Sequence, residues 1–211
     1  MYYDFAYVLE ELMDSGKILV NLITNSISSL VSVGTYVLMA LGIYTIAKRR
    51  AISNPWMAWI PVLNCWLIGC ISDQYRYVAK GQVKSKRKSL LVLSIIQVIL
   101  TIAFFVALLV AVIGGISSAV AGVSEAAIFQ SVMVPVIVML GLLLPMFGVG
   151  GAKTIIYYMS MYDLYTSCAP ENNALFLVLS IFFRITEPFF VFFNRNNDKG
   201  MPPRRETFEE V

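Results

Sequence analysis

Arg184 and Glu187 are the residues whose types and spacing most directly suggest chemistry, because they stand three apart in an otherwise apolar segment. On a helix this spacing places both side chains on one face, where they can form an ion pair. Ionisable pairs inside a membrane often mark a substrate or ion path. The alternative is a shallow segment whose charged side chains simply reach the lipid headgroups. The charges that flank the segment favour this alternative.

The three tryptophans, Trp56, Trp59 and Trp66, lie in one short stretch of the chain together with two prolines. Because tryptophan is enriched at the headgroup level, the stretch predicts an interfacial anchor. An aromatic cage is the other interpretation, but nothing in the sequence identifies the cation or sugar that would face it. Asn64 follows Pro61 and can either hydrogen-bond the backbone that the proline interrupts or line a polar path. We treat these tryptophans and Asn64, like the charged pair, as candidate binding residues.

A cluster of basic residues precedes the longest apolar run. Its members are Arg76, Lys80, Lys84, Lys86, Arg87 and Lys88. Such a cluster determines membrane topology and attracts anionic headgroups, each cation being worth about 1 kcal/mol near the surface. We expect a basic, lipid-facing loop here and no nucleic-acid site, since no separate domain supports the cluster.

The residues needed for catalysis are scarce. The chain contains no His, which excludes His-based triads and zincin motifs. Its cysteines, Cys65, Cys70 and Cys168, are scattered and cannot supply a four-ligand zinc site, so reduced thiols are expected. The paired carboxylates of an intramembrane aspartyl enzyme are also missing. We therefore expect no catalytic residue, metal or cofactor, and an enzyme acting on lipid or isoprenoid substrates is only the third hypothesis.

The elements that carry these residues must lie in a membrane. Of 211 residues, 58% are hydrophobic and 14% are charged, and the mean hydropathy is +0.75. A bilayer core needs about 20 apolar residues in a helix, so we predict an all-α integral membrane protein with full spans near 28–47, 89–113 and 131–152. Residues 54–72 and 175–193 are interrupted by prolines or charges and predict two half-inserted, re-entrant or interfacial helical hairpins.

The charge distribution predicts the orientation. The segment from Lys48 to Lys88 holds nine basic residues and one acid, whereas residues 1–17 sum to −3 and show the apolar period of an amphipathic helix. The positive-inside rule then places the basic segment in the cytoplasm and the N-terminus outside. Full crossings at the two interrupted segments would export basic residues, so both are expected to return to their own side. A single membrane domain, 18–194, and a cytoplasmic tail, 195–211, result.

Two segments carry a resemblance. Asn54 to Asn64 reads Asn-Pro-Trp-Met-Ala-Trp-Ile-Pro-Val-Leu-Asn, and Leu175 to Phe190 is followed by Gly-Met-Pro-Pro-Arg at 200–204. In these features the chain resembles uncharacterised multi-pass membrane proteins of anaerobic Gram-positive bacteria, a family of unknown function with a Trp-Ile-Pro…Asn membrane motif. The resemblance implies no activity. Pro often stands at the position of Arg184 in that family, which argues against a catalytic role for this arginine.

The leading hypothesis is a non-enzymatic multi-pass protein of the plasma membrane that associates with lipid or with a partner membrane protein. It is motivated by the predicted anchors, hairpins and charge asymmetry. The alternative is a small, oligomeric channel or transporter in which broken helices carry Asn64 and the Arg184/Glu187 pair along a path. Three spans in one chain enclose little space, so this alternative requires a homo-oligomer.

Overall fold

The computed structural model describes residues 2–83, 85–122 and 124–202, and its regular elements there are all helical. Their order along the chain is α1 (Tyr2–Arg49), the 3-10 helix η1 (Pro55–Trp59), α2 (Pro61–Lys80), α3 (Lys86–Val120), α4 (Glu125–Cys168), α5 (Asn173–Phe182) and α6 (Thr186–Phe193). The predicted all-α fold is confirmed.

Three stretches of helix are long and apolar enough to cross a membrane, namely Gly16–Arg49, Lys86–Ser118 and Phe129–Cys168. The prediction of three spans is therefore confirmed for the described part of the chain. Each stretch exceeds the predicted apolar run, because small and polar residues at its ends continue the helix. The predicted N-terminal helix is likewise continuous with the first span, and most side chains of residues 2–15 lie outside the description, so its amphipathic face stays a prediction.

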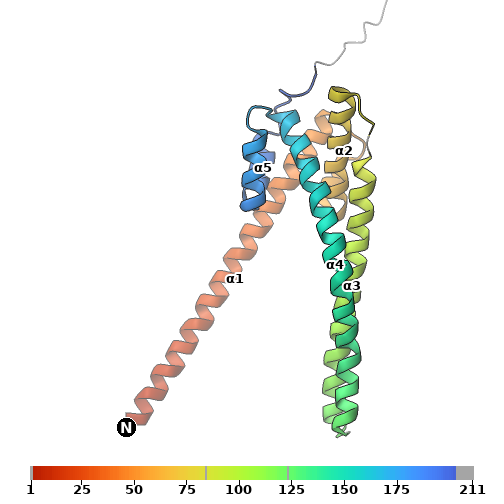
Figure 1. Ribbon diagram of the computed structural model, residues 1–211. Coiled ribbons are helices and arrows are strands. Elements are labelled where there is room, and N and C mark those ends of the chain that lie inside the picture. Colours follow the sequence, from red (N-terminus) through yellow and green to blue (C-terminus); the bar gives the residue numbers. More distant parts are fainter. Residues whose placement is uncertain (1, 84, 123, 203–211) are drawn as a thin grey trace, which may run out of the picture.

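The molecule has a head and two legs (Figure 1). The head consists of α2, α5, α6, residues 194–200 and the ends of α1, α3 and α4 that pack around them. One leg is the N-terminal part of α1, whose residues 16–34 are all exposed. The other leg is the antiparallel α3–α4 hairpin, which closes at Gly122 with a φ of 63° that favours glycine. Figure 1 shows the two legs diverging, so that a gap separates them below the head.

The segment after α1 turns back on itself. The hydroxyl of Tyr36 donates a hydrogen bond to the carbonyl of Trp59, which places η1 beside α1 about 20 Å before the end of that helix. Helix α2 then returns, and the Gln74 amide donates to the carbonyl of Arg50 at 3.0 Å. The chain therefore enters and leaves this segment at the same end of the molecule, as expected for a re-entrant segment at 54–72.

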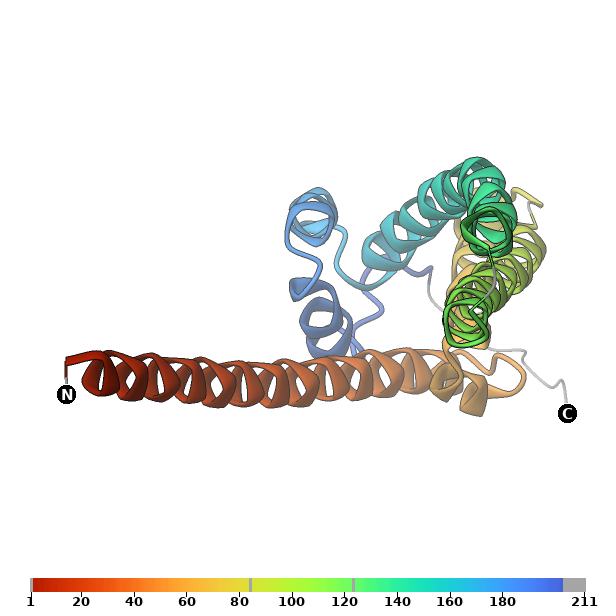
Figure 2. The same ribbon diagram turned by 90° about the horizontal axis from the view of Figure 1, so that it is seen from below.

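The α5–α6 segment also returns to its starting point. At its beginning the Asn173 amide donates to the Thr166 hydroxyl at 3.0 Å, and beyond its end the Gly200 amide donates to the Ser167 carbonyl at 3.1 Å. Viewed from below, the α5–α6 pair lies between α1 and the C-terminal part of α4 (Figure 2). This is the path expected for a hairpin at 175–193, whose depth in a bilayer stays a prediction.

The hydrophobic core lies in the head. Fully buried side chains from four helices meet there, including Ile43 on α1, Leu67 on α2, Leu164 on α4 and Val191 on α6. Gly69 allows α2 and α3 to approach closely, because a Cβ at this position would lie 2.6 Å from the Cα of Arg87. The head is therefore packed like the core of a soluble domain.

Candidate functional site

The structure separates the predicted Arg184/Glu187 pair. Helix α5 ends at Phe182 and α6 begins at Thr186, so Arg184 lies in the turn between them. Pro188 accounts for the break, because in a continuous helix its ring would clash with the carbonyl of Arg184. The prediction that both residues share one helix face is wrong, and no ion pair joins them in the described part of the chain.

Glu187 instead faces the protein interior. Its side chain is buried and accepts a hydrogen bond from the hydroxyl of Tyr157 on α4. Arg184 is exposed but lies near enough to act electrostatically on Glu187. The acid therefore links α6 to α4, while the guanidinium remains available to other groups.

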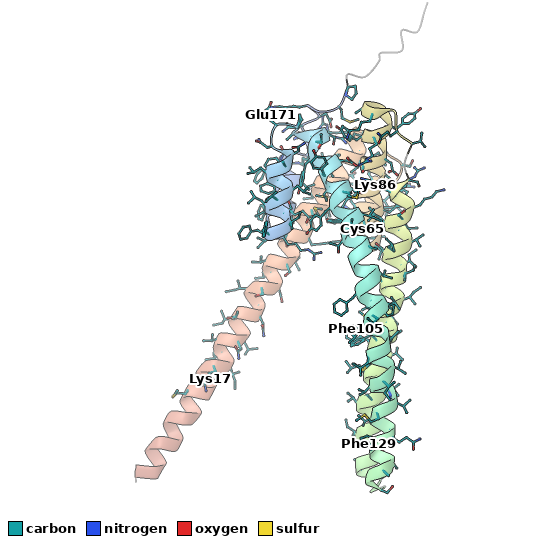
Figure 3. The ribbon with its side chains drawn as sticks, in the orientation of Figure 1. Lys17, Cys65, Lys86, Phe105, Phe129 and Glu171 are labelled. Atoms are coloured by element: carbon teal, nitrogen blue, oxygen red, sulfur yellow. The ribbon has the colours of Figure 1, made fainter. Side chains whose placement is uncertain are left out.

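Arg184 lies on a pocket of about 350 Å³ between the head and the gap, which Asn64, Gln97, Lys153 and Tyr157 also line. An adjoining pocket of about 430 Å³ is also lined by Arg184 and Tyr157. We call the two pockets together the central chamber. Cys65, another lining residue, lies in the lower part of the head, below Lys86 (Figure 3). The chamber thus gathers side chains from α1, α2, α3, α4 and the α5–α6 turn.

One polar group of the chamber is already engaged within the protein, whereas three others are available to a ligand. Asn64 already has a structural role, since its amide donates to the Ala58 carbonyl at 3.0 Å and so satisfies the irregular backbone before α2. The Oε1 atom of Gln97 is buried without a hydrogen-bond partner among the described residues. Lys153 and Arg184 form no ion pair in that same part of the chain. With Glu187 as the only acid, the chamber has a net positive charge and can attract an anion.

Two members of the predicted lipid-facing cluster point inward. Asp163 on α4, with a side chain that is 1% exposed, accepts hydrogen bonds on Oδ2 from Arg76 Nε at 2.6 Å and Lys86 Nζ at 2.8 Å. The hydroxyl of Ser72 donates to the same oxygen at 2.5 Å. Arg76 and Lys86 therefore clamp α2 and α3 to α4 and are not free to bind lipid. The reason is Asp163, a buried acid whose charge needs partners.

The rest of the cluster stays accessible. Lys80, Arg87 and Lys88 are exposed, and Lys84 lies outside the described residues. Asp73 accepts hydrogen bonds from the backbone amides of Lys86 at 2.9 Å and Arg87 at 3.2 Å. It thereby satisfies amides in the first turn of α3, where a negative charge is favourable.

A third polar cluster holds the C-terminal segment against α1. Arg50 is buried and contacts Asp198 at 2.7 Å and the Ser167 hydroxyl at 2.9 Å. Arg49 contacts the other oxygen of Asp198, also at 2.7 Å. Sequence reasoning missed this cluster and Asp163, because both join residues that are far apart in the chain.

The tryptophans divide between the surface and the core. Trp56 and Trp59 on η1 are 54% and 43% exposed, whereas Trp66 is partly buried against the core cluster. Exposed tryptophans on a short helix suit an interfacial anchor better than a cage, because a cage needs several rings around one ligand.

Comparisons with known proteins found no match: no family model matches the chain, and neither does any curated protein or solved structure. Its function must therefore be inferred from its own residues. The central chamber and the exposed basic residues of the head are the two features of the described chain that suggest a ligand.

Proposed function

We propose that this chain is a non-enzymatic, multi-pass protein of the plasma membrane that acts by association with anionic lipid. One observation carries the proposal. Among the described residues, every Lys and Arg other than Lys17 belongs to the head, and Lys17 lies on the free part of α1 (Figure 3). Such concentration of positive charge at one end favours that end being cytoplasmic, next to an anionic leaflet.

The exposed cations supply the attraction. Each Lys or Arg near an anionic surface contributes about 1 kcal/mol, and the contribution fades within a Debye length. Lys80 and Lys88 meet this description, since both are exposed at the basic end. The resulting orientation has the N-terminus outside and the C-terminus in the cytoplasm. Membership of the uncharacterised Trp-Ile-Pro…Asn family is proposed on the sequence motif alone.

The test is a lipid analysis of the purified full-length chain. The protein is reconstituted in phosphatidylcholine vesicles doped with phosphatidylglycerol and extracted in a mild detergent, and the lipids that co-purify are quantified by mass spectrometry. Phosphatidylglycerol should be enriched over its share in the vesicle, and less so at high salt. A lipid composition equal to that of the vesicle would refute the proposal.

Orientation has its own test. A cysteine placed at Lys84 in a background where Cys65, Cys70 and Cys168 are replaced by Ser should resist a membrane-impermeant maleimide in intact cells and react after permeabilisation. Labelling in intact cells would place the basic loop outside and would require five spans in place of three.

A small oligomeric channel or transporter is the second candidate. It is favoured by the central chamber, which brings Arg184 and Asn64 together between helices. If this function is correct, Arg184→Leu and Glu187→Leu should each alter solute flux in vesicles that contain the reconstituted protein. Unchanged flux in both variants would remove its best residues, whereas co-purification of a stoichiometric partner protein would favour a subunit role.

A further inference from the structure

The central chamber has the charges of an anion site. Lys153 on α4 and Arg184 on the α5–α6 turn line the same pocket, and neither makes an ion pair within the described chain. The nearby acid, Glu187, already accepts a hydrogen bond from Tyr157. Gln97, whose Oε1 atom is buried and unpartnered, adds an amide that can turn either end towards a ligand. An anion bound here would meet two cations, one acid and a neutral amide, which together keep a net positive charge.

The depth of the chamber matches a headgroup layer. Helix α4 begins at Glu125, and Lys153 lies 28 residues further on, a rise of about 42 Å. A bilayer with both headgroup regions is about 40–45 Å thick. When the start of α4 lies in the outer headgroup layer, Lys153 therefore lies in the inner one. An anion next to Lys153 would occupy the level at which lipid phosphates are found.

Below this level the chamber continues into apolar surroundings. The second pocket extends along α1 to Val31, on a leg whose residues 16–34 are all exposed. On the other leg, Phe147, six residues before Lys153 on α4, is 75% exposed. Figure 1 shows the gap between the two legs directly below the head. In a membrane, lipid hydrocarbon chains would contact these exposed apolar side chains.

The geometry points to an anionic phospholipid bound at the central chamber, with its phosphate on Lys153 and Arg184 and its acyl chains against the exposed apolar side chains of the legs. This inference rests on the proposed function and names the site of that association. A free phosphate would pair with the two cations but would leave the apolar surface below them uncovered. A neutral lipid would cover that surface but would leave the positive charge without a counter-ion. The lipid proposed is therefore one with net negative charge, and phosphatidylglycerol is the probe.

The experiment is a titration of the full-length chain with phosphatidylglycerol, followed by native mass spectrometry, to obtain the Kd of the first bound lipid. Lys153→Gln or Arg184→Gln should weaken this Kd by about fivefold each, and both together by about thirtyfold. The matched control is Lys17→Gln, which removes one charge from the α1 leg, outside the chamber, and should leave the first Kd nearly unchanged. Lys80→Gln with Lys88→Gln, which removes charge from the exposed basic end, should weaken the first Kd less than the two chamber variants together. Glycerol 3-phosphate should not displace the lipid.

The outcomes separate the two proposals. If the wild-type chain binds phosphatidylglycerol no better than phosphatidylcholine, the proposed function itself fails. If it does prefer phosphatidylglycerol, but only the Lys80/Lys88 double variant weakens binding, the function stands and the chamber site is refuted. Displacement by glycerol 3-phosphate would identify a soluble anion as the ligand and also overturn the inference. Glu187→Gln provides an independent check in case Lys153→Gln and Arg184→Gln fold poorly. Removing the acid should tighten the binding of phosphatidylglycerol.

Discussion

The head and the legs use the same residue types in different ways. In the α1 leg the hydroxyls of Thr24 and Ser32 donate to carbonyls four residues earlier in their own helix. In the head the Ser72 hydroxyl and the Arg76 guanidinium reach across to Asp163 on another helix. Polar groups in the head thus join elements, whereas those in the α1 leg bond within their own helix. The head therefore packs against itself, whereas apolar side chains of the α1 leg, such as Leu30 at 73%, are exposed.

The largest effect is expected from Asp163→Ala. It removes the acid that pairs with Arg76 and Lys86 and so leaves buried positive charge uncompensated, which costs about 3–5 kcal/mol. The loss is measured as the free energy of unfolding in mild detergent. Asp198→Ala is the comparison, because Asp198 is 31% exposed, Arg49 is 38% exposed, and the buried Arg50 keeps its hydrogen bond to the Ser167 hydroxyl. Equal losses for the two variants would mean that burial does not distinguish these clusters.

The next prediction concerns the Cys70 thiol in the head. Burial raises its pKa from 9.0 to about 11, and the nearby Arg87 opposes this shift only partly. Because the thiolate is the reactive form, Cys70 should react with maleimide about a hundredfold more slowly in the folded protein than after unfolding. The same shift makes the folded state lose stability as pH rises above 9, since the unfolded thiol ionises first. Rapid labelling of Cys70 in the folded chain at pH 8 would contradict the burial of this helix face.

Two glycines test close packing in the head against open surface on a leg. Gly69→Ala places a Cβ 2.6 Å from the backbone of Arg87, and the forced shift of α3 should cost about 1–3 kcal/mol of unfolding free energy. Gly141→Ala is the matched change on α4, where nothing lies within 4 Å, and should be neutral or slightly stabilising. If Gly141→Ala destabilises the chain as much, another molecule must pack against the hairpin at that point.

The smallest effect is expected when one methylene group is removed from each region. Ile68→Val acts on a fully buried side chain of the head and should cost about 0.5–1.5 kcal/mol. Ile113→Val acts on α3 where the side chain is 63% exposed, and should change the stability by less than about 0.5 kcal/mol. Thermal unfolding of both variants in one detergent gives the comparison. A larger loss at Ile113 would show that this part of the leg is an interface.

The sequence was sufficient for the fold class because hydropathy and charge are local properties. Long apolar runs predicted the three spans, and the positions of basic residues predicted that residues 54–72 and 175–193 return to their own side. The break at Arg184 was also present in the sequence, since Pro188 lies four residues later. The spacing of Arg184 and Glu187 predicted a shared helix face, and the break removes it.

The partners of buried charges could not be predicted in the same way. Asp163 joins residues on two other helices, 87 and 77 positions away in the chain, and no local pattern identifies such partners. The one available signal was that Asp163 is an acid close to a long apolar run, where an ionisable residue needs a partner. Lys153 carried a similar signal at the end of its run. In both cases the signal is an ionisable residue near a span, where the charge needs a neutralising partner.

The uncharged part of α4 between Glu125 and Lys153 has a consequence for the choice of membrane. It contains 27 residues, about 40 Å of helix, whereas an average hydrocarbon core is about 30 Å thick. The excess of about 10 Å keeps Glu125 and Lys153 in opposite headgroup layers when the hairpin stands upright, whereas a thinner bilayer would force the hairpin to tilt. The protein should therefore be most stable in bilayers of long-chain lipids, and should accumulate in the thicker regions of a laterally uneven membrane.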